Sequence, residues 1–274
     1  MTSAFAPGCV TLLGEHGGLA LAFTVAQGVT VTAVFETAVP VEPLLAAALD
    51  EFAALDTGLE VVSELPDMDG LSAATATCVA SALALGADSS DVLALAQRCR
   101  AVEQRAAGVE TGLGDPLAVL CGRPGEATLI DFKRAAVGQV PLALEGYQLV
   151  LVDAGPRGRQ ARRADAKRRA ECAEACQLLG VEALSDAPSA GTLPAPLGRR
   201  VRHVLSEDLR VRAAADALGR GDLAALGPLL DASHASLRDD FEVSTERVEQ
   251  VITELKAAGA LGARLSGGAV LALF

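Results

Sequence analysis

The chain has 274 residues, of which 51% are hydrophobic and only 3% aromatic, and its formal net charge is -12. This acidic balance argues against a nucleic acid or an anionic membrane surface as the main partner. The six cysteines form no C-x-x-C pair, no apolar run reaches the length that spans a membrane, and residues 1–5 lack the basic residues of a signal peptide. We therefore expect a cytoplasmic protein with reduced thiols.

The first part of the chain predicts a strand over residues 10–13, strands over 19–23 and 29–35, a helix over 43–55 and a strand over 59–65. Between the first two strands lies Gly14-Glu15-His16-Gly17-Gly18. A glutamate and a histidine flanked by glycines at the end of a strand are suited to hold a polar ligand. A glycine-rich hairpin whose polar residues face water explains the same pattern.

The segment 70–83 predicts a loop that turns into a helix of small residues. Ser72 is a typical helix N-cap, and Ala73 and Ala74 would leave the first backbone N–H groups uncovered. Uncovered N–H groups at the positive end of a helix dipole favour an anion, most often phosphate. The alternative is a small-residue helix packed against a sheet, because no Walker-type lysine follows the glycine.

A second helix is predicted from about residue 91 to 107, with Glu103 near its end. It leads into a loop with three glycines, residues 108–116, that closes on Asp115-Pro116. The glycines would let the backbone approach a ligand closely. Asp115 is either a functional carboxylate or an ordinary helix cap.

The remaining chain predicts apolar strands over 127–132 and 147–152 and then a helix that continues to residue 179. Seven arginines and lysines lie between residues 157 and 169, either as a phosphate-attracting cluster or as a solvated helix face. A loop over 185–197, helices over 199–218, 222–238 and 244–258, and a strand pair over 262–274 complete the prediction.

Several of these motifs resemble those of galactokinase-like members of the GHMP family of small-molecule kinases. Residues 6–16 are similar to the family's A-P-G-R-V-N-L-I-G-E-H opening, and Gly70-Leu71-Ser72 is similar to the start of its G-L-S-S-S-A phosphate loop. The segment around Glu103 and Asp115 resembles the stretch that carries a magnesium-binding glutamate and the catalytic aspartate. Residues 233–244 and 259–268 carry the most specific similarity.

The resemblance implies an α/β (α+β), two-lobed fold with the site in the cleft between an N-terminal half, 1–140, and a C-terminal half, 141–274. It implies ATP and Mg²⁺ as cofactors and a small sugar or polyol as acceptor. Asp115 would be the catalytic residue, and Glu103 and Ser72 would bind the metal. The implied binding residues are Glu15, His16 and Gly18 for the sugar, and Gly70, Leu71, Ser72, Ala73 and Ala74 for the nucleotide phosphates.

The departures from the family pattern concern the same motifs. Cys9 stands where the family has an arginine beside the reacting phosphate, and Ala73 and Ala74 replace two serines. Met68 replaces a loop glycine, Asp69 adds a negative charge that should repel phosphate, and the T-D-Y-N after the glutamate and histidine is missing. Asp165 replaces a tyrosine, the glycine run at 267–268 is short, and the region between residues 27 and 66 is shortened.

Two hypotheses follow. The chain is an ATP-dependent kinase whose acceptor has drifted from galactose, or it is a pseudokinase that keeps the scaffold to bind a sugar, a nucleotide or a protein partner. Glu103 and Asp115 favour the kinase, and the replacements at residues 9, 73, 74 and 68 favour the pseudokinase.

Overall fold

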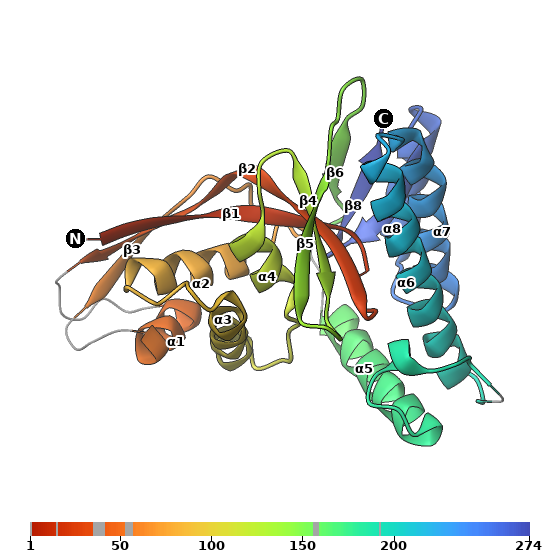
Figure 1. Cartoon of the computed structure of the whole chain (residues 1–274), viewed down its shortest axis with the longest axis horizontal. Helices are drawn as coiled ribbons and strands as arrows, with labels where there is room; N and C mark the ends of the chain where they lie inside the picture. The colour runs from red at the N-terminus through yellow and green to blue at the C-terminus, as the bar shows by residue number, and fades with distance from the viewer. Residues whose placement is uncertain (1, 15, 35–41, 53–56, 156–158, 192) are drawn as a thin grey trace. The chain divides into compact units, whose positions relative to one another are not determined.

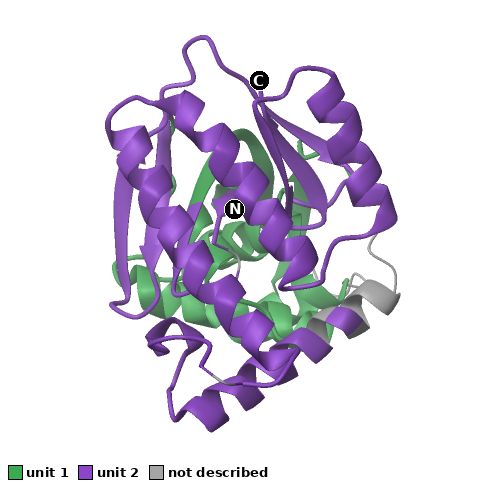
Figure 2. Cartoon of the chain, turned by 90° about the vertical axis from the view of Figure 1, so that its right-hand side faces the viewer, with its two compact units in different colours: residues 1–10, 22–67, 71–124 green, residues 11–21, 68–70, 125–274 purple. Residues whose placement is uncertain are grey.

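The computed structural model of the chain describes residues 2–14, 16–34, 42–52, 57–155, 159–191 and 193–274. The chain divides into two compact units, which are coloured separately in Figure 2. Unit 1 comprises residues 1–10, 22–67 and 71–124, and unit 2 comprises residues 11–21, 68–70 and 125–274. Each unit is therefore assembled from segments that are distant in the sequence.

Figure 1 labels the helices and strands along the chain. The strands are β1 (Thr2–Leu13), β2 (Leu19–Val34), β3 (Gly58–Ser63), β4 (Glu126–Asp131), β5 (Ala136–Pro141), β6 (Leu149–Asp153), β7 (Gly262–Ser266) and β8 (Ala269–Leu273). The helices are α1 (Pro43–Phe52), α2 (Ala73–Ala84), α3 (Val92–Ala107), α4 (Gly114–Cys121), α5 (Arg159–Leu179), α6 (Leu197–Gly219), α7 (Leu226–Asp239) and α8 (Glu246–Ala257), with short 3-10 helices at Leu184–Asp186 and Leu223–Ala225.

The strands form two sheets. One has the order β1-β2-β4-β5, with β3 paired to β2, and the other has the order β6-β8-β7. The predicted strands over 19–23 and 29–35 are one continuous strand, β2, as far as Val34, and residue 35 lies outside the described residues. Strand β5 was not predicted, because its side chains are largely exposed and show no apolar alternation.

In unit 1, helices α1 to α4 pack against one another (Figure 1). Helix α2 lies in contact with all three of the others, and most of its side chains are buried alanines or similarly small residues. Small side chains allow neighbouring helices to approach closely. The alanine-rich segment that predicted a tightly packed helix is thus the centre of this helical layer.

Ion pairs fasten the C-terminal end of α1 to α3. The Glu51 carboxylate accepts hydrogen bonds from Arg98 and Arg105, each at 2.9 Å, and the same arginines donate to main-chain carbonyls of Glu51 and Ala47. The Arg98 guanidinium also lies 4.4 Å from the ring centroid of Phe52. Cations here satisfy the last carbonyls of α1 and complement its dipole. We call this arrangement the Glu51 clamp.

In unit 2, strands β7 and β8 are buried along their whole length, and this hairpin packs against α7 and α8. The close approach of α7 to β7 requires two glycines: a Cβ added at Gly262 would lie 2.0 Å from the carbonyl oxygen of Gly227. The strand pair predicted for the end of the chain is therefore confirmed, and it forms the centre of a core cluster.

Arginines of α5 and α6 hold the turn that follows α7. Buried Arg200 donates to Glu171 at 2.7 Å and to Glu242 at 2.5 Å, and it also contacts the carbonyl of Asp240. Arg168 donates to the carbonyls of Phe241 and Glu242. Of the basic run 157–169, Arg168 thus serves a structural role, and the turn that it holds presents the Phe241 ring.

Helix α6 also carries a buried histidine. His203 is 1% exposed, and its Nδ1 lies 2.9 Å from Ser236 Oγ. Its ring packs on Phe241, with 4.6 Å between centroids. Burial lowers the pKa of His203 to about 3. The folded protein therefore holds this ring in its neutral form.

Among the described residues, no helix is long and apolar enough to cross a membrane.

The histidine gives a pH-dependent stability. The unfolded chain binds a proton at His203 near pH 6.5, whereas the folded chain excludes that proton until the pH approaches its folded pKa. The free energy of unfolding should therefore decrease as the pH is lowered from about 6.5 to about 5. This residue should account for roughly 2 kcal/mol of the decrease. A His203→Asn variant should show a flatter pH dependence in urea unfolding. An unchanged slope would contradict this assignment.

Candidate functional site

In unit 1, Ser72 and Asp115 meet where α2 and α4 begin. Ser72 precedes α2 with a left-handed backbone, φ 51° and ψ 40°, and its side chain makes no capping hydrogen bond. Its hydroxyl instead donates to Asp115 Oδ2 at 2.9 Å. Ser72 is therefore not the side-chain cap that the sequence predicts. The first N–H groups of α2 consequently receive no hydrogen bond from it.

Glu103 lies on the inner face of α3 and is 7% exposed. Its Oε1 atom is buried and has no hydrogen-bond partner within the part of the chain that the structure describes. Burial is the largest influence on its pKa, which rises to about 7, and the negative charge of Asp115 adds to the rise while a hydrogen bond from Thr75 opposes it. A buried carboxylate with an oxygen that has no partner is costly unless a cation or donor completes it.

Cys9 lies on β1 behind this pair. It is fully buried, and its backbone N–H donates to the Leu71 carbonyl at 3.1 Å, which ties the strand to the residue before Ser72. Burial, followed by the negative charge of Asp115, raises the thiol pKa well above its usual range. The side chain is therefore neutral. It does not supply the positive charge that the family pattern places here.

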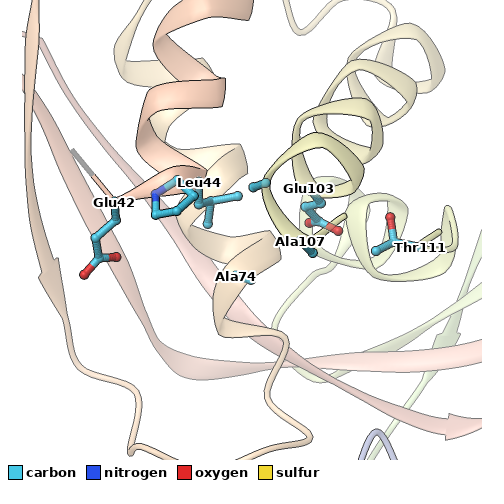
Figure 3. Close-up of a pocket in the computed structure, with 8 residues that line it drawn as sticks. Glu42, Leu44, Ala74, Glu103, Ala107 and Thr111 are labelled. Atoms are coloured by element: carbon cyan, nitrogen blue, oxygen red, sulfur yellow. The ribbon is translucent and has the colours of Figure 1, made fainter. Parts of the chain in front are cut away.

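A pocket of about 340 Å³ opens beside these residues in unit 1 (Figure 3). The start of α1 forms one wall, and the end of α3 with the following loop forms the other. The lining residues are Glu42, Pro43, Leu44, Ala74, Glu103, Ala106, Ala107 and Thr111. The sequence predicted only Ala74 and Glu103 among them. The three lining alanines were a weak signal, since small residues that gather at helix ends leave room for a ligand.

In unit 2, the carboxylates of Glu207 and Asp208 hold the glycine-rich loop between β1 and β2. Gly14 N donates to Glu207 Oε1 at 3.0 Å, and Gly18 N donates to Asp208 Oδ1 at 2.8 Å. Burial raises the pKa of Asp208. The sequence analysis did not identify this pair, although two adjacent carboxylates on an amphipathic helix, one of them at a buried position, would have been a usable signal.

The structure places the predicted sugar-binding residues of this loop as follows. His16 is exposed and stacks on Phe241, with 4.2 Å between ring centroids and 20° between planes. The N–H of Gly18 is engaged by Asp208, as described above. Glu15 lies outside the described residues.

The predicted phosphate-binding residues surround the start of α2. Gly70 has φ +90°, and a Cβ there would lie 2.8 Å from the Ala269 side chain, so a glycine is required. Leu71 is buried, whereas Ala74 is exposed and lines the pocket. Within the described residues, no group of three His, Cys, Asp or Glu side chains could hold a metal by themselves.

Comparison with known proteins identifies relatives of this chain. The family described as GHMP kinases C terminal matches residues 214–274. Galactokinase of Streptomyces coelicolor is 37% identical over 231 residues, which cover 77% of this chain and 59% of that protein. Galactokinase of Mycobacterium bovis is 38% identical over 230 residues, which cover 78% and 63%. The chain thus spans about three fifths of the length of these curated relatives.

Solved structures show the same relationship. A galactokinase of Lactococcus lactis complexed with galactose matches with a TM-score of 0.83 at 25% identity, covering 99% of this chain and 85% of that one. A mevalonate kinase of L. major in complex with R-mevalonate matches with a TM-score of 0.67 at 22% identity, covering 100% and 87%, which is a likeness of fold. The predicted α/β fold class is confirmed, and the chain belongs to the GHMP kinase family.

Proposed function

We propose that this chain is an ATP-dependent kinase that transfers the γ-phosphoryl group to a hydroxyl of a small sugar or related polyol. The observation that carries the proposal is the arrangement in unit 1: Asp115 is held by Ser72, and Glu103 presents an unpartnered oxygen, beside a pocket of about 340 Å³. Phosphoryl transfer depends on positioning and charge neutralisation more than on covalent chemistry. This arrangement can provide the positioning.

The pocket supports a nucleotide as the donor. Its apolar wall of Leu44, Ala106 and Ala107 suits an adenosine, and Ala74 places the start of α2 in the same pocket. The first N–H groups of α2, which Ser72 does not cap, suit the phosphates. Glu103 fits a cation because its buried Oε1 has no partner among the described residues. Mg²⁺, when bound, would neutralise part of the phosphate charge.

Asp115 is the proposed catalytic residue. It would accept the proton of the acceptor hydroxyl as that oxygen bonds to the γ-phosphorus and the bond to the β-phosphate oxygen breaks, which yields ADP and a phosphate monoester. The Ser72 hydrogen bond fixes the carboxylate at 2.9 Å from the serine hydroxyl.

His16 and Glu15 are the proposed contacts of the acceptor, as the sequence motifs imply. Gly18 is a weaker candidate than the sequence indicates, because its N–H already donates to Asp208. Together with the missing T-D-Y-N, this supports an acceptor other than galactose, although the relatives are galactokinases.

A pseudokinase is the second candidate, and the neutral, buried Cys9 is the observation that favours it. Loss of a charge-stabilising group near a transition state commonly costs about 10²- to 10³-fold in rate.

A thermal-shift titration with Mg·ADP and Mg·ATP tests the nucleotide site. A ligand at 100 times its Kd should stabilise the native state by about 2.7 kcal/mol and raise the Tm accordingly. Monosaccharides and polyols added to Mg·ATP should then identify an acceptor by ADP release. Binding of nucleotide and sugar without turnover would identify a pseudokinase. The absence of nucleotide binding would refute the pocket as a nucleotide site for either candidate function.

Asp115→Asn should reduce turnover by at least about 10²-fold, because the amide cannot accept the hydroxyl proton. Nucleotide affinity should stay near the parent value, since the amide oxygen can still accept the Ser72 hydrogen bond. Asp50→Asn, at an exposed position on α1, is the matched control and should leave turnover unchanged. Parent-like turnover in Asp115→Asn would exclude Asp115 as the catalytic residue.

Ala107→Trp should fill the pocket and weaken Mg·ADP binding by about tenfold or more, while the fold tolerates it because residue 107 is exposed. Ala101→Trp is the matched control, on the same helix but away from the pocket lining. Isothermal titration calorimetry gives both affinities. Equal affinities in the two variants would place the nucleotide elsewhere.

A further inference from the structure

Two buried oxygen atoms in the unit 1 pocket, Glu103 Oε1 and Thr111 Oγ1, have no hydrogen-bond partner among the residues that the structure describes. Both residues line the pocket. Figure 3 shows the Glu103 carboxylate extending from α3 toward the loop that carries Thr111. Buried polar atoms in proteins almost always have a partner, so two such oxygens in one pocket point to a shared ligand.

The backbone at Thr111 is fixed to the same helix that carries Glu103. The Gln104 side-chain amide donates to the Thr111 carbonyl at 3.3 Å, and Gln104 is the next residue after Glu103. The loop and the end of α3 therefore form one local assembly.

The chemistry of the two atoms selects the class of ligand. A carboxylate oxygen and a hydroxyl oxygen are hard donors, and a carboxylate that is 7% exposed needs a positive partner. Mg²⁺ and similar divalent cations are commonly held by one or two protein oxygens, with water and phosphate oxygens completing the coordination. Two protein oxygens are therefore enough.

Ser72, the other oxygen that the sequence assigned to the metal, is not among the residues that line this pocket. Its hydroxyl proton is directed to Asp115 Oδ2 at 2.9 Å. The hydroxyl that lines the pocket together with Glu103 is that of Thr111.

We propose that Glu103 Oε1 and Thr111 Oγ1 together form the protein part of a divalent-cation site in this pocket, in place of a pair formed by Glu103 and Ser72. This inference rests on the proposed function in that the cation would accompany the nucleotide. Thr111 thereby becomes a binding residue that the sequence motifs did not identify.

Mn²⁺ binding tests the proposal, measured by the loss of the free-ion electron paramagnetic resonance signal, with and without ADP. Thr111→Val should weaken Mn²⁺ binding by about tenfold or more, since even outer partners of a metal site matter by 10- to 100-fold. Glu103→Gln should weaken it further. Thr111→Ser, which keeps the hydroxyl, should retain binding within a few-fold and shows that the loop folds.

Two controls sharpen the test. Thr77→Val removes a hydroxyl that is satisfied by the Ala73 carbonyl on α2, so Mn²⁺ binding should match the parent. Ser72→Ala should change Mn²⁺ affinity less than Thr111→Val does. If Thr111→Val binds like the parent, or if Ser72→Ala is the more damaging change, the proposal is overturned.

ADP binding without Mn²⁺, measured by calorimetry, separates this inference from the proposed function. If the parent binds ADP but no Mn²⁺, the cation site is wrong and the nucleotide site stands. If Mn²⁺ binds and depends on Thr111 but ADP does not bind, the cation site stands and the proposed function fails. If neither binds, both are overturned.

Discussion

The arrangement of unit 1 depends on the hydrogen bond from Ser72 to Asp115. A non-glycine residue at φ 51° stores strain of the order of 1–3 kcal/mol, and it persists only where its surroundings hold it. Here the Cys9 N–H fixes the preceding carbonyl and Asp115 fixes the hydroxyl. Helices α2 and α4 both begin at this contact. The same hydrogen bond therefore fixes the start of α2, whose first N–H groups receive no cap from Ser72, and the position of the Asp115 carboxylate.

Unit 2 uses buried carboxylates for a similar purpose. Glu207 accepts hydrogen bonds from Gly14 N, Arg210 Nε and Ser233 Oγ. Burial tends to raise its pKa, but the positive charges of Arg264 and Arg210, with the Ser233 hydrogen bond, lower the pKa to about 2. Such a paired, fully hydrogen-bonded charge fixes geometry more than it adds stability, and removal of one partner is costly. Helix α6 thus holds Gly14 and Gly18, which lie on either side of His16 in the sequence.

Local signals in the sequence predicted much of the fold. The ends of α3 follow from the Asp91 cap and Gly108, and the buried β7–β8 hairpin follows from its apolar run with glycines at the bend. Sequence patterns do not indicate which distant side chains meet. Asp208 contacts Gly18 across 190 positions, and no spacing rule reports such a contact. Ser72 was predicted as a cap because its residue type favours that role, but the left-handed backbone turns its hydroxyl to Asp115.

The candidate site shows the same limit. Glu103 and Asp115 were predicted through their resemblance to family motifs, and the structure brings Glu103, Asp115 and Ser72 into one cluster. The walls of the pocket were not predicted, since alanines at helix ends look alike whether they pack or line a cavity. Thr111 was missed for a related reason: a threonine in a glycine-rich loop is ordinary until its hydroxyl is found buried without a partner.

The Glu51 clamp should make α1, and with it one wall of the pocket, sensitive to ionic strength. It joins α1 to α3 through two guanidinium groups that are 45% and 50% exposed, so dissolved ions screen the attraction over a Debye length of about 8 Å at physiological salt. Residues at the opposite end of α1, Pro43 and Leu44, form a wall of the pocket. Salt should therefore weaken the attachment of one end of a ten-residue helix whose other end lines the pocket, although no charged residue of the clamp is among the lining residues.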